Sequence, residues 1–230
     1  MEISNEIVPC VILAGGKGRR MGGKEKALIP LLDRPLLSYV LEKISGKVAP
    51  IALNINTNLE QFTKFGYPII EDPIKGHLGP LAGILASLNW AKQHNKDWVM
   101  TLPCDTPFLP HNLVQSMLNA KNNQSDVDLI VAKSRGFNHP VIALWKSEIN
   151  IKLKNALDEG IRKIDIFTNQ LKIVYVEFYN IDNSIFDPFT NLNSPRDLIY
   201  AQQILGKLPP FFGLAGWSGS GKTTLSTKII

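Results

Sequence analysis

The sequence predicts an α/β fold in three layers, with a mainly parallel sheet between two layers of helices. Short apolar runs alternate with amphipathic segments of helical length along most of the chain. Several of these runs are apolar almost throughout, as expected for strands that are buried on both faces. Four of the runs lead to a glycine-rich loop, to Asn54, to Asp72 or to Asp105, at the positions where a parallel sheet collects its ligand-binding loops. We therefore expect a Rossmann-like architecture with one site at the carboxyl ends of the strands.

Seven strands are expected, because seven apolar runs are bounded by turn residues or by helical segments. The first, at 7–14, is nearly continuous, and the second, at 48–54, keeps this pattern despite Pro50 near its start. The remaining five are the runs at 67–70, 98–103, 127–132, 141–145 and 172–178.

Helices are expected between the strands wherever apolar residues recur at helical spacing. Proline is tolerated in the first turn of a helix, and four predicted helices begin at one. These four span 35–45, 80–92, 110–121 and 195–205, and weaker helical segments lie at 58–65, 146–158 and 162–170.

Composition excludes several classes of protein. The chain has 230 residues, 44% of them hydrophobic, which is too apolar for a disordered chain. No apolar run reaches the length of a membrane span, and the first nine residues lack the layout of a signal peptide. The only cysteines, Cys10 and Cys104, cannot form a disulfide framework. We therefore expect a cytoplasmic protein that does not associate with membranes.

The positive charge is concentrated in one glycine-rich segment. The whole chain carries a net charge of +5, and residues 17–26 hold five Lys and Arg residues against Glu25 alone, a local net charge of +4. Nucleic-acid binders usually spread basic residues along a face. Glycine lets backbone N–H groups approach an anion closely. The segment therefore favours a compact polyphosphate as the ligand and not a nucleic acid.

Residues 13–28 read LAGGKGRRMGGKEKAL, and this is the strongest motif in the chain. Its spacing differs from both the dinucleotide fingerprint and the Walker loop. It is similar to the nucleotidyltransferase signature, in which an acidic residue and a lysine follow the glycine loop. We expect backbone amides and Arg20 to hold a triphosphate, with Lys26 as a mobile positive charge.

Three further motifs follow predicted strands or precede a predicted helix. Asp105 lies in PCDTP, Asp72 follows the third strand and precedes GPLAG at 79–83, and NLNSP places two asparagines before the last helix. A carboxylate at a strand end suits a divalent cation that bridges phosphates. Each motif alone is weak, since an Asp before Thr-Pro is commonly a turn or a cap, but the set in this chain order is specific.

Together, these motifs make residues 1–205 resemble the molybdenum cofactor guanylyltransferases, of the nucleotide-diphospho-sugar transferase fold. The resemblance implies transfer of GMP from GTP to the terminal phosphate of molybdopterin or Mo-molybdopterin, with release of pyrophosphate. Leu13 and Ala14 are followed by Gly15 and Gly16, where the cytidylyl relative usually reads LAAG. The alternatives are a molybdenum cofactor cytidylyltransferase, a sugar-phosphate nucleotidyltransferase, or a non-catalytic GTP-binding adaptor.

The resemblance also implies a role for each matching residue. Lys26, Asp105 and Arg20 would be catalytic, and Asp105 would bind Mg²⁺, with Mn²⁺ as the alternative. The nucleotide would contact the following residues: Leu13, Ala14, Gly15, Gly16, Lys26, Asn54, Asp72 and Asp105. Within this set, Asn54 and Asp72 would hold the guanosine. The pterin side would include Asn191, Asn193 and His139. Glu25 departs from the more common Asp but keeps its charge.

The last twenty residues contain a second phosphate-binding motif. After a linker at 206–210, residues 211–230 hold a complete Walker loop with Gly216, Gly221, Lys222 and Thr223. This stretch resembles the start of the MobB-type molybdopterin-guanine dinucleotide biosynthesis adaptors. It lacks an acidic strand end and a sheet to dock on, so we expect a truncated second domain without GTPase activity. A MobB-type adaptor and molybdoenzyme chaperones are expected as further partners.

Overall fold

The computed structural model describes residues 7–18, 23–74, 79–179 and 187–206. Three groups of predictions lie outside these ranges. They are the catalytic role of Arg20, most of the linker at 206–210, and the Walker loop with Gly216, Gly221, Lys222 and Thr223.

Seven strands of the described residues form one sheet. Their bounds are β1 Cys10–Leu13, β6 Ile51–Asn54, β7 Ile69–Ile70, β8 Trp98–Pro103, β9 Leu129–Ser134, β10 Phe137–Lys146 and β11 Ile173–Glu177. The order across the sheet is β11-β9-β10-β8-β1-β6-β7, and β1 pairs in parallel with both β6 and β8. The mainly parallel sheet is therefore confirmed, with β10 as the antiparallel exception.

The antiparallel strand arises from a hairpin that the apolar pattern did not reveal. Arg135 and Gly136 both have positive φ, at 49° and 80°, and turn the chain tightly from β9 into β10. A register shift between His139 and Ala143 then bends β10, so that its second half also pairs with β8. The structure extends the predicted strand at 141–145 to Phe137–Lys146. A type of turn that needs positive φ at a non-glycine residue is difficult to recognise from sequence.

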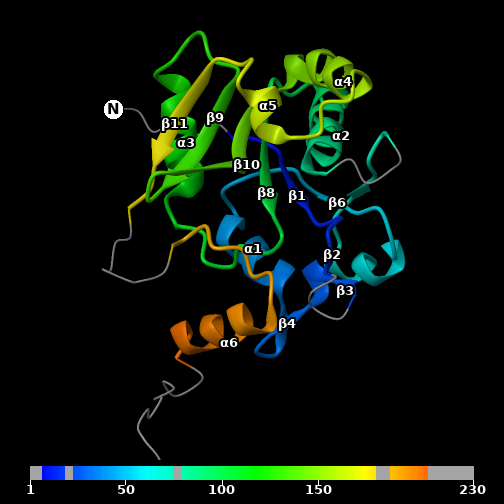
Figure 1. The fold of residues 1–230 in the computed structure, drawn as a ribbon, viewed down its shortest axis with the longest axis vertical. Helices are drawn as coiled ribbons and strands as arrows, with labels where there is room; N and C mark the ends of the chain where they lie inside the picture. The colour runs from blue at the N-terminus through cyan, green and yellow to red at the C-terminus, as the bar shows by residue number, and fades with distance from the viewer. Residues whose placement is uncertain (1–6, 19–22, 75–78, 180–186, 207–230) are drawn as a thin grey trace, which may run out of the picture.

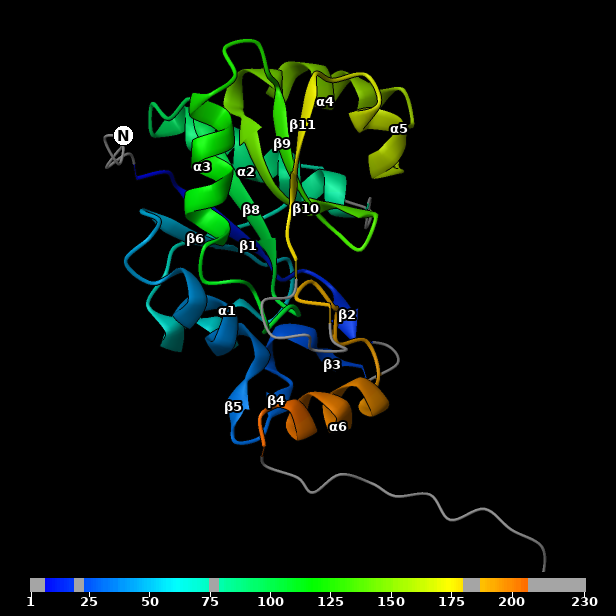
Figure 2. The same ribbon diagram turned by 90° about the vertical axis from the view of Figure 1, so that its left-hand side faces the viewer.

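Helices cover both faces of the sheet (Figures 1 and 2). On one face lie α1 Leu36–Ile44 and α3 Leu113–Asn122, and on the other lie α2 Pro80–Gln93, α4 Asn150–Asp158 and α5 Ile164–Thr168. Alternate residues of β1 supply the two cores: Cys10 and Ile12 pack with the first group, and Val11 packs with the second. This burial on both faces explains the nearly continuous apolar run at the start of the chain.

A third, smaller cluster joins the last helix to an early hairpin, and both of these elements lie below the sheet in Figure 1. The helix is α6 Pro195–Ile204, and the hairpin consists of β4 Pro30–Leu31 and β5 Arg34–Pro35. Leu31, Leu192 and Ala201 are fully buried in this cluster. The glycine-rich segment contains a further small hairpin, β2 Lys17–Gly18 with β3 Lys24–Glu25. Neither hairpin was predicted, because each strand is only two residues long.

Other boundaries differ by a few residues. The predicted helix at 58–65 is the 3₁₀ helix η3 Leu59–Phe65, and short 3₁₀ turns also occur at η2 Lys26–Leu28 and η4 Ser147–Ile149. The helix predicted to begin at Pro110 begins at Leu113. Strand β1 begins at Cys10 rather than at residue 7, and β6 begins after Pro50.

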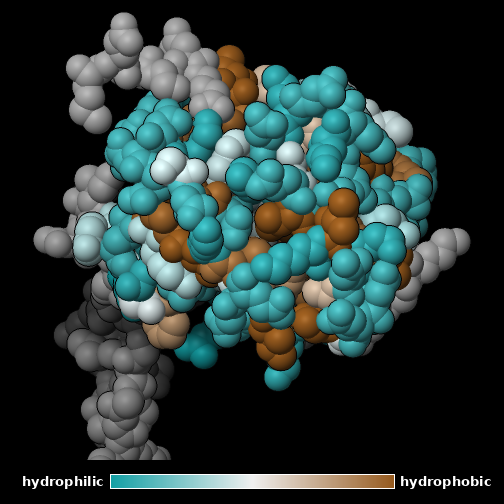
Figure 3. Space-filling model, turned by 90° about the horizontal axis from the view of Figure 1, so that it is seen from above, coloured by the Kyte–Doolittle hydropathy of each residue, from teal (hydrophilic) through white to brown (hydrophobic). Residues whose placement is uncertain are grey.

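Both cysteines and two of the tryptophans lie in the core. Cys10, Cys104, Trp90 and Trp145 are buried, whereas Trp98 is only partly buried. Burial raises the pKa of both thiols far above the ordinary range. Figure 3, a view from above Figure 1, shows mainly hydrophilic residues with small hydrophobic groups between them. Within the described ranges, no helix is both long and apolar enough to cross a membrane.

Candidate nucleotide-binding site

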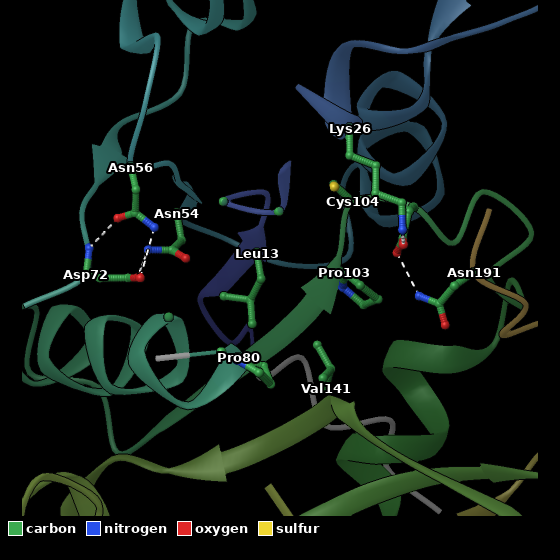
Figure 4. A pocket seen from close by; sticks show the side chains of 15 residues that line it. Leu13, Lys26, Asn54, Asn56, Asp72, Pro80, Pro103, Cys104, Val141 and Asn191 are labelled. Atoms are coloured by element: carbon green, nitrogen blue, oxygen red, sulfur yellow. Dashed lines mark hydrogen bonds and ion pairs between the residues drawn. The ribbon is translucent and has the colours of Figure 1, made fainter. Parts of the chain in front are cut away.

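A cavity of about 430 Å³ lies at the carboxyl ends of the central strands. Leu13 ends β1, Asn54 ends β6 and Pro103 ends β8, and all three line it. Figure 4 shows two polar groups on opposite sides, with Leu13 and Pro103 between them. The cavity therefore has two polar ends separated by an apolar floor, at the sheet edge where the sequence predicted a site.

The first polar end is built on Asp105 and Lys26. Lys26 Nζ forms an ion pair with Asp105 Oδ2 and donates a hydrogen bond to Asn193 Oδ1 at 2.5 Å. Asn191 Nδ2 donates to Asp105 Oδ1 at 2.7 Å. The Lys26 side chain is 14% exposed and that of Asp105 is 8% exposed. A lysine and a carboxylate are thus held together at the edge of the cavity, where phosphate charge could be neutralised.

The segment before α6 brings both asparagines to the Lys26–Asp105 pair. Asn191 bonds Asp105 and Asn193 bonds Lys26, while Leu192 between them is buried in the third cluster. The Leu192 N–H donates to the Asp105 carbonyl at 3.0 Å. A capping box then stops the segment, because Ser194 and Asp197 exchange side-chain and backbone hydrogen bonds at the start of α6.

The second polar end consists of Asn54, Asn56 and Asp72. Asn54 Nδ2 donates to Asp72 Oδ1 at 2.9 Å, and Asn56 Nδ2 donates to Asp72 Oδ2 at 2.9 Å. The Asp72 backbone N–H donates back to Asn56 Oδ1 at 2.8 Å. Each oxygen of the Asp72 carboxylate therefore has an amide donor from a different asparagine.

Two glycines make this second end sterically possible. A Cβ on Gly83, in the first turns of α2, would lie 2.5 Å from Asn54 Oδ1. A Cβ on Gly15 would lie 2.6 Å from Asn56 Nδ2. Any side chain at either position would collide with an asparagine of the network. Gly79, with φ of 75°, supplies the turn that places Pro80 at the start of α2.

Glu25, which precedes Lys26, connects the two ends of the cavity. Its Oε1 accepts hydrogen bonds from Thr57 Oγ1 at 2.8 Å and from Asn58 Nδ2 at 2.6 Å. The residue is only 9% exposed, and its Oε2 has no hydrogen-bond partner among the described residues. Glu25 thus ties the lysine-bearing turn to the loop that carries Asn56.

The residues predicted for the site fall into two groups. Leu13, Gly15, Gly16, Lys26, Asn54, Asp72, Asp105 and Asn191 all line the cavity. Ala14 does not, because its side chain is fully buried and its N–H donates to the Asn54 carbonyl at 3.0 Å. Asn193 contacts Lys26 without lining the cavity.

His139 lies away from the cavity that was expected to include it. Its Nε2 is 2.8 Å from Ser134 Oγ, and its ring packs against Phe189 with centroids 4.9 Å apart. Ser134 Oγ donates to the Asp187 carboxylate at 2.8 Å. Burial lowers the pKa of His139, and the carboxylates of Asp187 and Glu177 oppose this shift. In the structure, the His139 ring is therefore engaged in fastening the segment that leads to Asn191.

The cavity is also lined by residues that were given no role from the sequence. Gly79, Gly83 and Cys104 line it from the GPLAG and PCDTP motifs, and Asn56 and Val141 lie outside every predicted motif. The signal for Asn56 was present, since it repeats the asparagine two residues earlier after the same strand. Val141 was predicted only as a strand residue, and it reaches the cavity because β10 lies next to β8.

The site also bears on metal binding. Among the described residues, no three His, Cys, Asp or Glu side chains gather as a metal centre. Mg²⁺ is usually held by one or two carboxylates together with substrate phosphates. Asp105 fits that pattern, because its carboxylate lines the cavity beside a lysine.

Comparison with known proteins identifies the family of this chain. The model of the MobA-like NTP transferase domain family matches residues 10–171. A molybdenum cofactor guanylyltransferase of Rhodopseudomonas palustris (strain BisB5) is 42% identical over 199 residues, covering 85% of this chain and 93% of the relative. Another, from Shewanella loihica, is 37% identical over 82% of this chain and 92% of the relative.

Solved structures show the same fold. Molybdopterin-guanine dinucleotide biosynthesis protein A of Archaeoglobus fulgidus has a TM-score of 0.70 and 26% identity, over 87% of this chain and all of that one. A CMP:2-keto-3-deoxy-manno-octonic acid synthetase shares the fold at a TM-score of 0.62 and 11% identity, over 87% of this chain and 98% of that one. The nucleotide-diphospho-sugar transferase fold expected from the sequence is confirmed. The chain belongs to the MobA-like NTP transferase family and, within it, to the molybdenum cofactor guanylyltransferases.

Proposed function

We propose that the protein transfers GMP from GTP to the terminal phosphate of molybdopterin or Mo-molybdopterin and releases pyrophosphate. One observation carries the proposal: a single cavity has a Lys26–Asp105 pair at one end and a carboxylate held by two amides at the other. The first end suits phosphates, and the second suits the hydrogen-bond donors of a base. Guanylyltransferases among the relatives support the choice of reaction.

The reaction requires the protein mainly to position its two substrates and to neutralise their charge. The acceptor's terminal phosphate oxygen attacks the α-phosphorus of GTP, a new P–O bond forms, and the bond to the β-phosphate oxygen breaks. A phosphate nucleophile is already ionised at neutral pH, so it needs no general base. Two anionic substrates must be held in line, which requires a local positive field.

Lys26 provides that charge in our proposal. Its ammonium group is held by Asp105 and Asn193, both of which lie in other parts of the chain. A lysine on a flexible stem can leave these partners and follow the phosphates as charge moves from the α-phosphorus to pyrophosphate. Arg20 is proposed as a second cation from the same loop.

The family generally uses a divalent metal, and here we propose Mg²⁺, with Mn²⁺ as the alternative. Asp105 would hold it together with the substrate phosphates, and the cation would neutralise charge on the triphosphate. Asn191, which donates to the same carboxylate at 2.7 Å, would keep Asp105 oriented toward the cavity.

The nucleotide and the acceptor are tested by one assay. Each of the four nucleoside triphosphates is offered with Mg²⁺, with and without molybdopterin, and pyrophosphate release is followed. The proposal is supported if GTP is the only one of the four triphosphates that yields pyrophosphate, and if it does so only when molybdopterin is present. Release with CTP, or with a sugar phosphate as acceptor, would favour the cytidylyl or sugar-phosphate alternative instead.

Several other roles are proposed with this activity. Residues 1–205 would form the guanylyltransferase domain, and Asn191, Asn193 and His139 would support the pterin side, His139 indirectly. A MobB-type adaptor and molybdoenzyme chaperones would be partners. Two buried, unpaired thiols suit a reducing compartment, so we propose that the protein acts in the cytoplasm.

A further inference from the structure

Asn56 is a cavity residue with an unusual set of contacts. Its carboxamide forms a two-bond pair with one residue: Nδ2 donates to Asp72 Oδ2 at 2.9 Å, and Oδ1 accepts from the Asp72 backbone N–H at 2.8 Å. Both residues line the cavity (Figure 4). The pair fixes the Asp72 side chain relative to its own backbone. Asn56 therefore acts on the cavity chiefly through Asp72.

The carboxylate of Asp72 is held from both sides. Asn54 Nδ2 donates to Oδ1 at 2.9 Å, so neither oxygen is free to rotate away without breaking a bond to an amide. An ionised carboxylate has about four acceptor positions, and these two side-chain bonds use only two of them. Both oxygens can therefore accept further hydrogen bonds, and the two asparagines fix the plane of the carboxylate.

This arrangement matches one base better than the others. Guanine presents two neighbouring donors, N1–H and the N2 amine, which a carboxylate of fixed orientation can accept together. Hypoxanthine lacks the N2 amine, and cytosine presents acceptors at N3 and O2, next to each other. To accept from both guanine donors, the carboxylate must lie in the plane of the base. Whether it does depends on how the Asp72 carboxylate is rotated.

The backbone of Gly15, in the glycine-rich loop, lies against the Asn56 side chain. A Cβ at this position would lie 2.6 Å from Asn56 Nδ2, so the Gly15 backbone already lies against the amide. The phosphate-binding loop therefore limits the room in which the Asn56 side chain can move.

We propose that Asn56 is a specificity-determining positioning residue, which holds the Asp72 carboxylate in the orientation that accepts both N1–H and the N2 amine of guanine. This inference rests on the proposed function, because it concerns the base that the same site selects. It predicts that Asn56 controls the preference for GTP over ITP, since these nucleotides differ only in the N2 amine.

The test measures equilibrium binding of GTP and ITP to the full chain by titration calorimetry with Mg²⁺. The parent protein should prefer GTP by roughly ten- to hundred-fold, the ratio expected for one hydrogen bond to a charged group. In Asn56→Ala that ratio should fall to within about threefold of unity, mostly through weaker GTP binding. Gly15→Ala should reduce the ratio in the same direction by displacing Asn56, and it carries the test if Asn56→Ala does not fold.

Asn119→Ala is the matched control, because its carboxamide also bonds a side chain, accepting from Gln115 Nε2 at 2.8 Å, but it lies on α3 and does not line the cavity. It should keep the ratio of the parent protein even if both affinities change. If Asn56→Ala weakens GTP and ITP equally, or if the parent protein does not distinguish them, the inference is wrong and the proposed GTP reaction still stands. If the parent protein binds CTP and not GTP, the proposed function itself fails.

Discussion

Replacing Gly83 with alanine tests how much the close approach between α2 and Asn54 matters for stability and for nucleotide binding. Gly83 lies in a helix, where alanine is normally favoured over glycine by about 1 kcal/mol. A surface helix would therefore gain stability from this change. Here the added methyl group would lie 2.5 Å from Asn54 Oδ1 and 3.2 Å from Leu13 Cδ2. The two effects oppose each other, so the sign of the result is informative.

The magnitude follows from what Asn54 would lose. Its oxygen would have to retreat by about 0.9 Å to reach ordinary contact at 3.4 Å, yet the residue is only 3% exposed. Its Nδ2 also donates to Asp72 Oδ1 at 2.9 Å. Losing a hydrogen bond to a charged group costs about 1.5–3 kcal/mol. After the gain in helix propensity, the free energy of unfolding should fall by roughly 0.5–2 kcal/mol.

Nucleotide binding should suffer as well, because Asn54, Asp72 and Gly83 all line the cavity. We expect affinity for GTP to fall by about tenfold, which corresponds to about 1.4 kcal/mol. Urea unfolding monitored by tryptophan fluorescence would measure stability, and titration calorimetry would measure GTP binding. A loss of both supports the described contact.

The control is Ser87→Ala, one turn further along α2. Ser87 Oγ donates to the Gly83 carbonyl at 2.7 Å and does not line the cavity. This variant should bind GTP as the parent protein does, with stability changed by less than about 1 kcal/mol. A Gly83→Ala protein that is more stable than the parent and binds GTP equally well would refute the reasoning, since Asn54 would then have room to spare.

Three further changes test the other end of the cavity and its support. Lys26→Ala should slow pyrophosphate release by about 10²–10³-fold, since it removes the positive charge that neutralises the phosphates. The urea midpoint should change little, because Asp105 keeps its hydrogen bond from Asn191. Near-normal turnover would contradict this role. Asp105→Asn keeps the shape but loses the charge, so half-maximal activity should need much more Mg²⁺; an unchanged Mg²⁺ titration counts against Asp105 as the ligand. Burial of His139 lowers its pKa below the usual 6.5 despite Asp187, so the stability present above pH 6.5 should decline as the pH falls below it. His139→Gln should flatten this dependence in urea unfolding at pH 7.5 and 5.5, and an equal slope in both proteins would exclude His139 as its source.

Local patterns were sufficient for much of this protein. Apolar runs located all seven strands of the main sheet. The signal is strongest for its central strands, because a strand buried on both faces must be apolar along its length. Prolines marked the starts of α2 and α6, since proline suits the first turn of a helix. The predicted residues Lys26, Asp72 and Asp105 all line the cavity, because parallel strands bring their carboxyl ends to one edge.

Tertiary structure decided which polar residues became partners. Asn191 lies 86 positions from Asp105, and Asn56 lies 16 from Asp72, so no local pattern could pair them. The need for glycine at position 83 is likewise invisible locally, because it arises from a side chain at the end of a neighbouring strand. Spacing along the chain determines helices and strands through their backbone periodicity. Close contacts between side chains depend on which strands become neighbours, and only the folded sheet establishes that.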